Sequence, residues 1–323
     1  MSLLVVMAHF DFERRLREHT LRTLEALSAD SDRVVVVSTS GLREQDLARL
    51  PPRVEFIARA NYGYDFYSYK WALDAVGNFG DFDRLVICND SFVGPLVPLR
   101  DVVDSTQARS CDLMGMTYSH HHGGHVQSFF MSVNSHVARS RAFRRFWQDM
   151  EPVTNRMDVI HKYEIGFSRA IENAGFTLGS YFQPSEEEEV LAQDRYLWFR
   201  EHRIDATYPD KVLAELHPFV PGSKPWNPAV AYADRVLDNN RLPLLKFDTL
   251  RFDPYELGSR RLLTACEERK PEAFRGVSSF LEATKSRYPF RRGEVNRPAS
   301  EEKQQSQAVG YLLDRATTRN EGC

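Results

Sequence analysis

Four short apolar runs in the first 90 residues constrain the fold of this chain most strongly. They occupy residues 3–7, 34–37, 54–57 and 84–88. Between them, residues 12–27 and 66–76 carry apolar side chains at helical spacing. Continuous apolar runs are typical of strands buried on both faces, and strands that alternate with helices form mostly parallel sheets. The sequence therefore predicts an α/β fold, with a mostly parallel sheet flanked by helices.

Length and charge limit the organisation and the partners. The 323 residues suffice for one large α/β domain with additions, and the formal charge of −3 excludes a generic polyanion binder, so no nucleic acid is expected. We expect the main domain at residues 1–256 and a helical, polar C-terminal extension at 257–323. Its tail, from about residue 298, has the composition of a weakly ordered segment.

The lack of a recognisable targeting signal and the spacing of the cysteines indicate a reducing compartment. No apolar run reaches the roughly 18 residues of a membrane span, and the first residues lack a basic signal-peptide region. The four cysteines show no paired spacing. We expect a cytoplasmic protein. The basic region at residues 260–292 suits peripheral contact with the inner membrane, and equally a solvated surface.

Polar side chains follow every predicted strand, at the sheet edge where α/β folds bind ligands. Because Asn, Asp and Ser also suit caps and turns, a structural role is the alternative at each position. The chain contains neither a P-loop nor a dinucleotide fingerprint. The positions are His9, Asp11, residues 38–40, residues 61–65 and residues 89–91.

The turn before the second predicted helix suits a phosphate group. Gly63 lets the backbone approach a ligand closely, and Asp65 is expected to cap a helix that begins at Phe66. The free N–H groups of such a helix end attract anions. Lys70, one turn further, either adds a positive charge or extends over a surface face.

Asp90 is the candidate metal ligand. It ends an apolar strand between Asn89 and Ser91, and hard oxygen donors of this kind hold Mg²⁺ or Mn²⁺ together with a substrate diphosphate. The alternative is an Asx-turn at the start of the following Gly-Pro loop.

A histidine-rich stretch follows further along the chain. His120, His121, His122 and His125 raise a zinc hypothesis, but no Cys or carboxylate at ligand spacing accompanies them. Residues 125–133 read as a strand with a polar first half. We favour substrate contacts at the positions His125, Gln127 and Ser128.

Glu164 is the candidate catalytic residue. Apolar spacing predicts a helix over residues 159–174, with Glu164 on its apolar face. Burial there is expected to raise the pKa of this carboxyl toward the range of a general base, and a structural ion pair is the alternative. Lys224 and Lys246 are candidates for contact with a phosphate.

Six motifs occur in a fixed order along residues 3–255. They are NYGYDF at 61–66, NDSFVGPL at 89–96, HVQSFFM at 125–131, YEIGFS at 163–168, NP at 227–228 and LPLLK at 242–246. Together they resemble the rhamnan synthesis F family of bacterial polysaccharide glycosyltransferases. The resemblance implies a GT-A-type fold, a nucleotide-diphosphate sugar donor, a glycan or lipid-linked glycan acceptor, and commonly Mg²⁺ or Mn²⁺.

The resemblance also implies roles for individual residues. Asn61, Gly63 and Asp65 would face the donor, Glu164 would be the base, and Asp90 would replace the usual Asp-x-Asp metal motif. Only one aspartate is present at that motif. We expect a transferase of rhamnose or another hexose in capsule, O-antigen or related synthesis. The alternatives are a non-catalytic scaffold partner of a polysaccharide synthase and a metal hydrolase built on the histidines.

Overall fold

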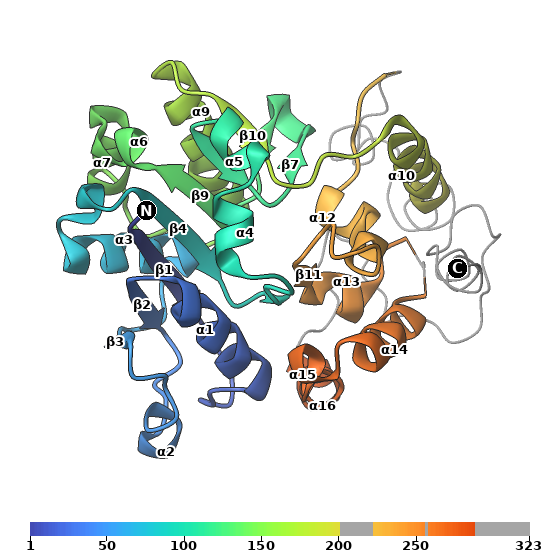
Figure 1. The fold of residues 1–323 in the computed structure, drawn as a ribbon, viewed down its shortest axis with the longest axis horizontal. Helices are drawn as coiled ribbons and strands as arrows, with labels where there is room; N and C mark the ends of the chain where they lie inside the picture. Colours follow the sequence, from blue (N-terminus) through green and yellow to red (C-terminus); the bar gives the residue numbers. More distant parts are fainter. Residues whose placement is uncertain (201–221, 256–257, 288–323) are drawn as a thin grey trace. The chain divides into compact units, whose positions relative to one another are not determined.

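The computed structural model describes residues 1–200, 222–255 and 258–287, and these form two compact units (Figure 1). The sheet unit consists of Met1–Tyr118 and His122–Tyr181, and the helical unit contains Ser119–His121 and the described residues from Phe182 onward. The predicted boundary at residues 256–257 and the predicted tail from residue 298 lie outside the described residues. So does the basic region from residue 288 onward, and these expectations stay predictions.

The strands and helices of the sheet unit follow one another with short connections. In chain order they are β1 (Leu3–His9), α1 (Glu18–Asp30), β2 (Arg33–Ser38), α2 (Glu44–Leu47), β3 (Val54–Ala58), α3 (Tyr64–Val76), η1 (Phe79–Asp81), β4 (Arg84–Asn89), β5 (Phe92–Val93), α4 (Leu99–Val103), α5 (Thr106–Ser110), β6 (Leu113–Gly115), β7 (Tyr118–Ser119), η2 (His121–Gly123), β8 (His125–Val126), β9 (Phe130–Asn134), α6 (Ser135–Arg139), α7 (Arg141–Gln148), α8 (Arg156–Asp158), η3 (Val159–Ile165), α9 (Gly166–Asn173) and β10 (Leu178–Ser180). Within this series, β7 and η2 each contain residues of both units.

A seven-stranded sheet organises the sheet unit, in the order β10-β6-β9-β4-β1-β2-β3. β9 runs antiparallel to β4 and β6, and the other neighbouring strands are parallel. In the centre, Val5 is paired with Val34 on one side and Val86 on the other. Every residue of β1 and β4 is buried, as continuous apolar strands between two helical layers must be. The predicted mostly parallel α/β sheet is confirmed.

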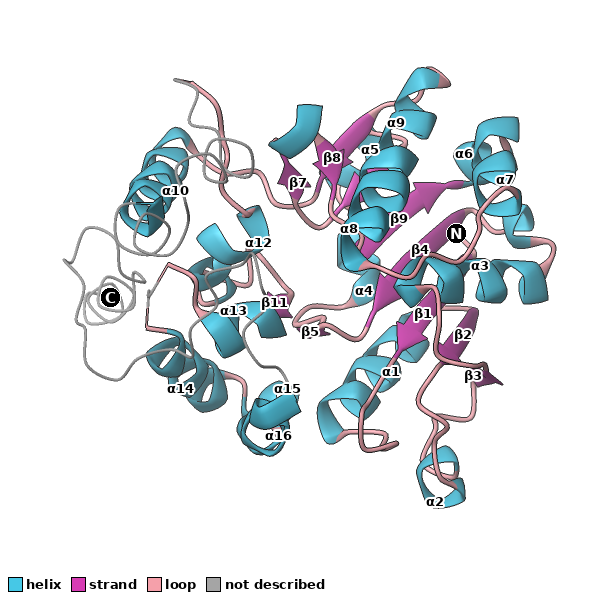
Figure 2. Ribbon diagram, turned by 180° about the vertical axis from the view of Figure 1, so that it is seen from behind, coloured by secondary structure: helices cyan, strands magenta, loops and turns pink. Residues whose placement is uncertain are grey.

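Helices cover both faces of this sheet. Alternate residues of β1, such as Leu4 and Val6, belong to a core shared with α3, α6, α7 and α9, whose aromatic centre includes Phe66, Trp147 and Phe167. Figures 1 and 2 show α1 and α4 on the opposite face. The sheet therefore exposes its strand ends rather than its faces.

Three predicted elements differ from the observed ones. The helix expected at residues 12–27 begins only at Glu18, because a loop with left-handed backbone at Arg14 precedes it. The strand expected at residues 125–133 is interrupted between β8 and β9. The helix expected at residues 159–174 starts as a π-helix, η3, before α9 continues it. π-helical turns are rare in proteins overall, and those that occur are often located at functional sites.

The described part of the helical unit contains mainly helices. They are α10 (Glu186–Phe199), α12 (Pro228–Ala231), η5 (Ala233–Val236), α13 (Phe247–Phe252), α14 (Ser259–Arg269), α15 (Pro271–Phe274), α16 (Val277–Thr284) and η6 (Lys285–Arg287), with the short strand β11 (Leu245–Lys246). A buried ion pair joins Arg195 of α10 to Asp234 of η5 at 3.0 Å. Among the described helices, none has the length and hydropathy that crossing a lipid bilayer requires.

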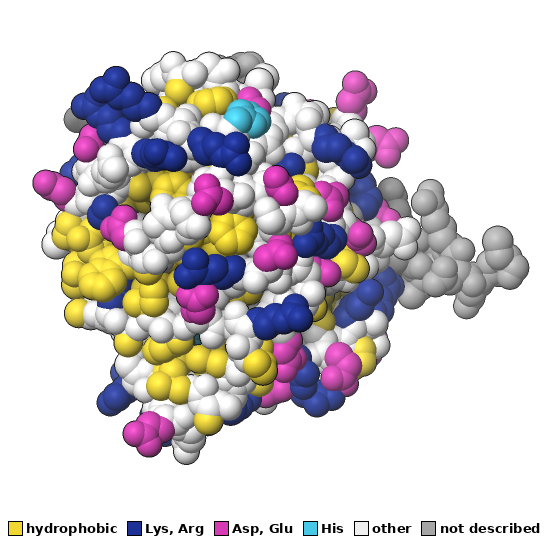
Figure 3. All heavy atoms as spheres, turned by 60° about the vertical axis from the view of Figure 1, so that its left-hand side comes forward, with side chains coloured by type: hydrophobic (Ala, Val, Ile, Leu, Met, Phe, Trp, Pro, Cys, Tyr) yellow, Lys and Arg dark blue, Asp and Glu magenta, His cyan; other side chains and the backbone are white. Residues whose placement is uncertain are grey.

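Basic and acidic side chains alternate on the face of the molecule in Figure 3, with hydrophobic patches between them. This mixture agrees with the near balance of 42 Lys and Arg against 45 Asp and Glu in the sequence. A face of this kind lacks the single-sign field by which proteins attract polyanions.

Candidate active site

The point between β1 and β4 is where the strand order of the sheet reverses. From β1 the chain adds β2 and β3 on one side, and β4 then returns to the other side of β1. In open α/β sheets the crevice at such a switch point, beyond the carboxyl ends of the strands, is the usual ligand site. His9 ends β1, and Asp90 follows β4 directly. The two candidate residues therefore flank the switch point from neighbouring strands.

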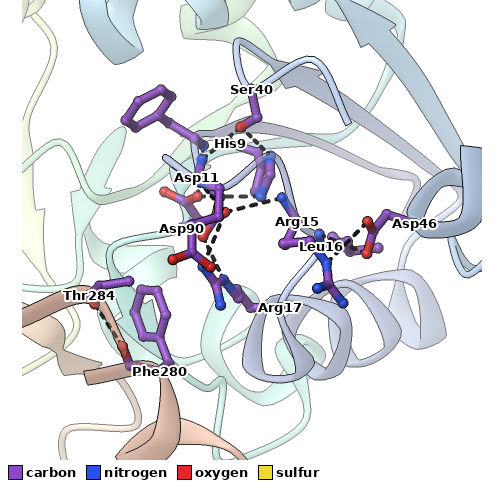
Figure 4. A network of polar contacts seen from close by, with 12 residues as sticks. His9, Asp11, Arg15, Leu16, Arg17, Ser40, Asp46, Asp90, Phe280 and Thr284 are labelled. Atoms are coloured by element: carbon purple, nitrogen blue, oxygen red, sulfur yellow. Dashed lines mark hydrogen bonds and ion pairs between the residues drawn. The ribbon is translucent and has the colours of Figure 1, made fainter. Parts of the chain in front are cut away.

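Asp90 is held in place by the backbone that follows β1 (Figure 4). Its Oδ2 accepts a hydrogen bond of 2.8 Å from the N–H of Phe10. The same oxygen lies 3.9 Å from Nε2 of His9, whose Nδ1 lies 2.9 Å from Oγ of Ser38. The ends of β1, β2 and β4 are thus joined by one polar chain of contacts.

Burial shifts the pKa values of Asp90 and His9 in opposite directions, and each shift favours the neutral form of the group. It raises the pKa of Asp90 to about 8; the Phe10 N–H opposes this shift and the Asp65 and Asp11 carboxylates add to it. Burial lowers the pKa of His9 to about 4, against the attraction of Asp11 and Asp46. At neutral pH the imidazole is uncharged, and a positively charged ligand group would favour the ionised form of Asp90.

Asp11 forms the loop between β1 and α1 rather than an open ligand position. Its carboxylate accepts a bond of 2.6 Å from Nε of Arg17 and bonds from the N–H groups of Glu13 and Arg15. Its own N–H donates to Oγ of Ser40 at 2.6 Å. These contacts explain why α1 begins later than predicted. Arg17, which sequence reasoning missed, forms an ion pair with Asp11 and so lies next to the site (Figure 4).

The first turn of α3 is joined to the end of β4 by Asn89. Nδ2 of Asn89 donates to Oδ2 of Asp65 at 2.8 Å, and its Oδ1 accepts from the N–H and Oγ of Ser91 at 3.1 and 2.6 Å. The Asx-turn that sequence analysis considered at Asp90 is therefore made by Asn89. α3 begins at Tyr64 after Gly63, so the prediction of Asp65 as the N-cap of a helix from Phe66 was wrong.

Glu164 lies at the centre of a second polar cluster. Its Oε2 accepts a hydrogen bond of 3.0 Å from the N–H of Ser128 and another from the Ser128 hydroxyl, and its Oε1 lies 3.4 Å from Nε2 of His125. Of its side chain, 19% is exposed. His125 lies in β8, and Ser128 lies in the segment between β8 and β9. The sequence pattern did not reveal this interruption of the strand.

The expected direction of the Glu164 pKa shift was wrong. Burial raises the pKa, as predicted, but the hydrogen bond and charge of His125 and the two hydrogen bonds from Ser128 outweigh it, and the pKa falls to about 2. Hydrogen bonds to a charged form stabilise that form. Glu164 is therefore an ionised carboxylate at neutral pH.

Tyr69 of α3 connects the two clusters. Its ring is buried, and its hydroxyl donates to the carbonyl of Ser128 at 3.2 Å. Burial raises its pKa well above the usual value, and the negative potentials of Asp65, Asp90 and Glu164 contribute, with Cys88, in the same direction. The Tyr69 hydroxyl therefore belongs to the same hydrogen-bond network as Glu164, through Ser128. Sequence analysis missed Tyr69, although its position four residues after Asp65 on the buried face of the helix was a usable signal.

Several predicted site residues have other contacts. Lys70 donates to the Trp147 carbonyl at 2.8 Å and lies 3.3 Å from Asp74. Gln127 is buried, and its Oε1 accepts from Oγ1 of Thr117 at 2.7 Å.

The remaining predicted positions lie as follows. Asn61 is exposed in the turn before α3. Lys224, which is paired with Glu189, and Lys246, at the end of β11, belong to the helical unit. Their predicted contacts with a phosphate stay predictions.

The histidines do not converge on one point. Nε2 of His121 contacts the carbonyl of Pro225, the ring of His122 lies 5.1 Å from that of His161, and His125 faces Glu164. Within residues 1–200, 222–255 and 258–287, no three His, Cys, Asp or Glu side chains are grouped so that they could hold a metal ion. A metal held by protein ligands alone does not fit these residues, and Asp90 supplies one carboxylate at the switch point.

Comparison with known proteins identifies a family to which this sequence is similar. The model of a family described as rhamnan synthesis protein F matches residues 34–219, more than half of the chain. An uncharacterized protein, y4gN, of Sinorhizobium fredii is 27% identical over 179 residues, which cover 54% of this chain and 47% of the relative. Virulence protein VirA of Vibrio anguillarum is 31% identical over 153 residues, which cover 46% and 45%. The match spans about half the length of each of these relatives.

Similar solved structures include two transferases. One is the galactosyltransferase LgtC with donor and acceptor sugar analogs, at a TM-score of 0.33 and 13% identity, covering 55% of this chain and 72% of that chain. The other is a putative glucose-1-phosphate thymidylyltransferase from Bacillus anthracis, at a TM-score of 0.37 and 9% identity, covering 55% and 86%.

Proposed function

Because the chain belongs to the rhamnan synthesis protein F family, we propose that it is a glycosyltransferase of bacterial polysaccharide synthesis. It transfers a sugar, rhamnose or another hexose, from a nucleotide-diphosphate donor to a glycan acceptor. The observation that supports this best is the pair of polar clusters that Tyr69 connects: Asp90, with Asn89 bound to Asp65, at the end of β4, and Glu164, bound by Ser128, whose carbonyl accepts from the Tyr69 hydroxyl. A transferase needs two neighbouring subsites there, one for each substrate.

The donor lies at the switch point between β1 and β4. Asp90, fixed by the Phe10 N–H, binds the donor there, and Asn89 fixes the first turn of α3 through Asp65. The amides at the start of this 13-residue helix favour an anionic diphosphate. Dependence on Mg²⁺ or Mn²⁺ through Asp90 stays a prediction.

The acceptor lies at Glu164. The acceptor hydroxyl donates to the carboxylate, and as its oxygen attacks the anomeric carbon, the C–O bond to the diphosphate breaks and the hydroxyl proton passes to Glu164. A low pKa keeps Glu164 in the deprotonated form that accepts this proton. The forming bond acidifies the attacking hydroxyl and so drives the transfer. Displacement in one step inverts the anomeric configuration.

His125 and Ser128 orient the base. Both donate to the Glu164 carboxylate, and the Tyr69 hydroxyl donates to the Ser128 carbonyl, which fixes the position of Ser128. These contacts hold the carboxylate in one orientation before the acceptor binds, which reduces the reorganisation needed in the transition state.

A thermal-shift screen of nucleotide diphosphates and nucleotide sugars, with and without Mg²⁺ or Mn²⁺, tests the donor site. A ligand present at 100 times its Kd stabilises the folded state by about 2.7 kcal/mol. For a unit of this size that corresponds to a rise of about 5 to 10 °C in the melting temperature. We expect the rise with one nucleotide in the wild type and its loss in Asp90→Asn.

Asp149→Asn is the matched control, since it removes an exposed carboxylate of the same unit, which is paired with the exposed Arg145. The control is expected to respond like the wild type. If no nucleotide shifts the wild type, the glycosyltransferase proposal fails, and a non-catalytic scaffold of a polysaccharide synthase takes its place. If Asp90→Asn responds fully, Asp90 is not in the donor site.

A further inference from the structure

Exposed aromatic side chains gather on α3, the helix whose first turn contains Asp65, and just before it. Tyr62 and Tyr64 are each 44% exposed and Trp71 is 39% exposed, and the half-buried Tyr67 lies between the last two in sequence. Tyr67 and Trp71 of α3 share one side of the helix, because residues four apart are neighbours there, and Tyr64 precedes them with a left-handed backbone. At about 1.5 Å per residue, positions 64 to 71 extend over roughly 10 Å along the helix. We call Tyr62, Tyr64, Tyr67 and Trp71 the aromatic ridge.

A buried arginine holds the start of this ridge. Arg59, 8% exposed, donates to the carbonyls of Ala60, Tyr62 and Tyr64 at 2.9, 2.6 and 2.9 Å. It also donates to the hydroxyl of Ser68 at 2.8 Å.

The same guanidinium stacks on two rings of the ridge. It lies 5.2 and 5.5 Å from the ring centres of Tyr62 and Tyr67, which are themselves 5.3 Å apart. Burying a cation to bind backbone carbonyls costs desolvation free energy, and the result is a turn with a single conformation. The turn is therefore rigid before any ligand arrives.

The backbone of the turn forces Tyr64 outward. Gly63 and Tyr64 have φ angles of +74° and +55°, both in the left-handed region. For a residue with a side chain this conformation is unfavourable, because Cβ crowds the following carbonyl oxygen. The Tyr64 hydroxyl donates to the Thr154 carbonyl at 3.4 Å, which fixes the direction of the ring. Strain of this kind, held by surrounding contacts, is concentrated at ligand-binding positions.

The start of the ridge adjoins a residue of the candidate active site in the chain. Tyr64 and Asp65 are consecutive in the first turn of α3, and Asp65 contacts Asn89 at the end of β4. The described donors of Arg59 go to carbonyls and one hydroxyl, so the ridge presents aromatic rings and hydroxyls rather than a cation. Such a surface suits an uncharged ligand with apolar faces and hydroxyl edges, which is the chemistry of sugar rings.

We propose that the aromatic ridge binds the acceptor glycan, with successive sugar rings stacked on Tyr62, Tyr64 and Trp71. This extends the acceptor site from the single sugar at Glu164 to a longer stretch of chain. The choice of a glycan as the ligand rests on the proposed function. The rigid turn lowers the entropy cost of binding, because the aromatic contacts are oriented in advance.

A printed array of bacterial oligosaccharides, rhamnose-containing ones included, tests the proposal with the full chain. The double variant Tyr62→Ala/Tyr64→Ala and the single variant Trp71→Ala are each expected to lose at least about tenfold in binding, since a buried aromatic anchor contributes more than 1.4 kcal/mol. The matched controls, Tyr62→Phe/Tyr64→Phe and Trp71→Phe, keep the rings and are expected to bind. Melting temperatures measured on all variants establish that they fold.

The outcomes separate this proposal from the proposed function. If glycan binding depends on the rings and no nucleotide raises the melting temperature, the proposal for the ridge is supported and the proposed transferase activity is refuted. If a nucleotide raises the melting temperature but no glycan binds, the transferase proposal is supported and the proposal for the ridge is refuted. Unchanged binding in the alanine variants also overturns it. So does a ring-dependent dimer in sedimentation, or ring-dependent binding to phosphatidylglycerol vesicles without glycan binding, because the ridge would then serve self-association or a membrane.

Discussion

Replacing Glu164 by Gln is expected to cost stability as well as activity. In the folded protein the pKa of this carboxyl falls from 4.5 to about 2, because the donors His125 and Ser128 outweigh burial. A tenfold change in a protonation equilibrium corresponds to about 1.4 kcal/mol, so the ionised network contributes about 3 kcal/mol at neutral pH. Gln keeps an oxygen for Ser128 but loses the charge that attracts His125.

The pH dependence of the difference has a defined sign. A carboxyl whose folded pKa is lowered stabilises the protein fully above its unfolded pKa, and this contribution is lost as the pH falls through the folded pKa. The stability difference between the wild type and Glu164→Gln is therefore expected to be largest above about pH 5 and to shrink between the unfolded value of 4.5 and about 2.

Urea unfolding at a series of pH values between 7 and 3.5 measures this difference. Glu172→Gln, at an exposed position of the neighbouring helix α9, is the matched control and is expected to stay within about 0.5 kcal/mol of the wild type. A difference at pH 7 below about 1 kcal/mol, or one that grows as the pH falls, would refute the assignment of Glu164 as an ionised, hydrogen-bonded centre.

Two further predictions concern the rigid turn and the thiols. Gly63→Ala is expected to destabilise by more than about 2 kcal/mol, since φ is +74° and the new Cβ would lie 2.7 Å from Cβ of Tyr67. Gly77→Ala, with φ of +68° and open space around its Cβ, isolates the backbone cost in the same denaturation assay, and equal losses would contradict the clash. Cys88 and Cys266 are expected to resist a thiol reagent until the protein unfolds, because burial raises the pKa of both, that of Cys266 to about 12. Rapid labelling of either in the native state would contradict their burial.

Some features of the site were predictable because they depend on position along a strand. Apolar runs identify buried parallel strands, and the residues just after them must lie at one edge of the sheet. His9 and Asp90 were found in this way, and the structure places them on neighbouring strands. The pattern also put Glu164 on a largely buried face, which is where it lies.

Other features required contacts between distant segments. The pKa of Glu164 depends on Ser128 and His125, which are 36 and 39 positions away, and no local pattern reports them. The π-helical turn that carries Glu164 has the same apolar spacing in sequence as an α-helix. Lys70 has the spacing of a phosphate ligand, but packing turns it to the carbonyl of Trp147.

The sequence by itself therefore determined the class of fold and the edge of the sheet that carries the polar residues, because periodicity and burial are local properties. Only the tertiary structure decided which of these residues meet, which carboxyl is ionised and which aromatic rings remain exposed. Tyr69, whose buried hydroxyl contacts the Ser128 carbonyl beside Glu164, shows the difference. Its hydrophobic spacing placed it in the core, whereas its role between the two clusters arises from strand order and from donors brought together by packing.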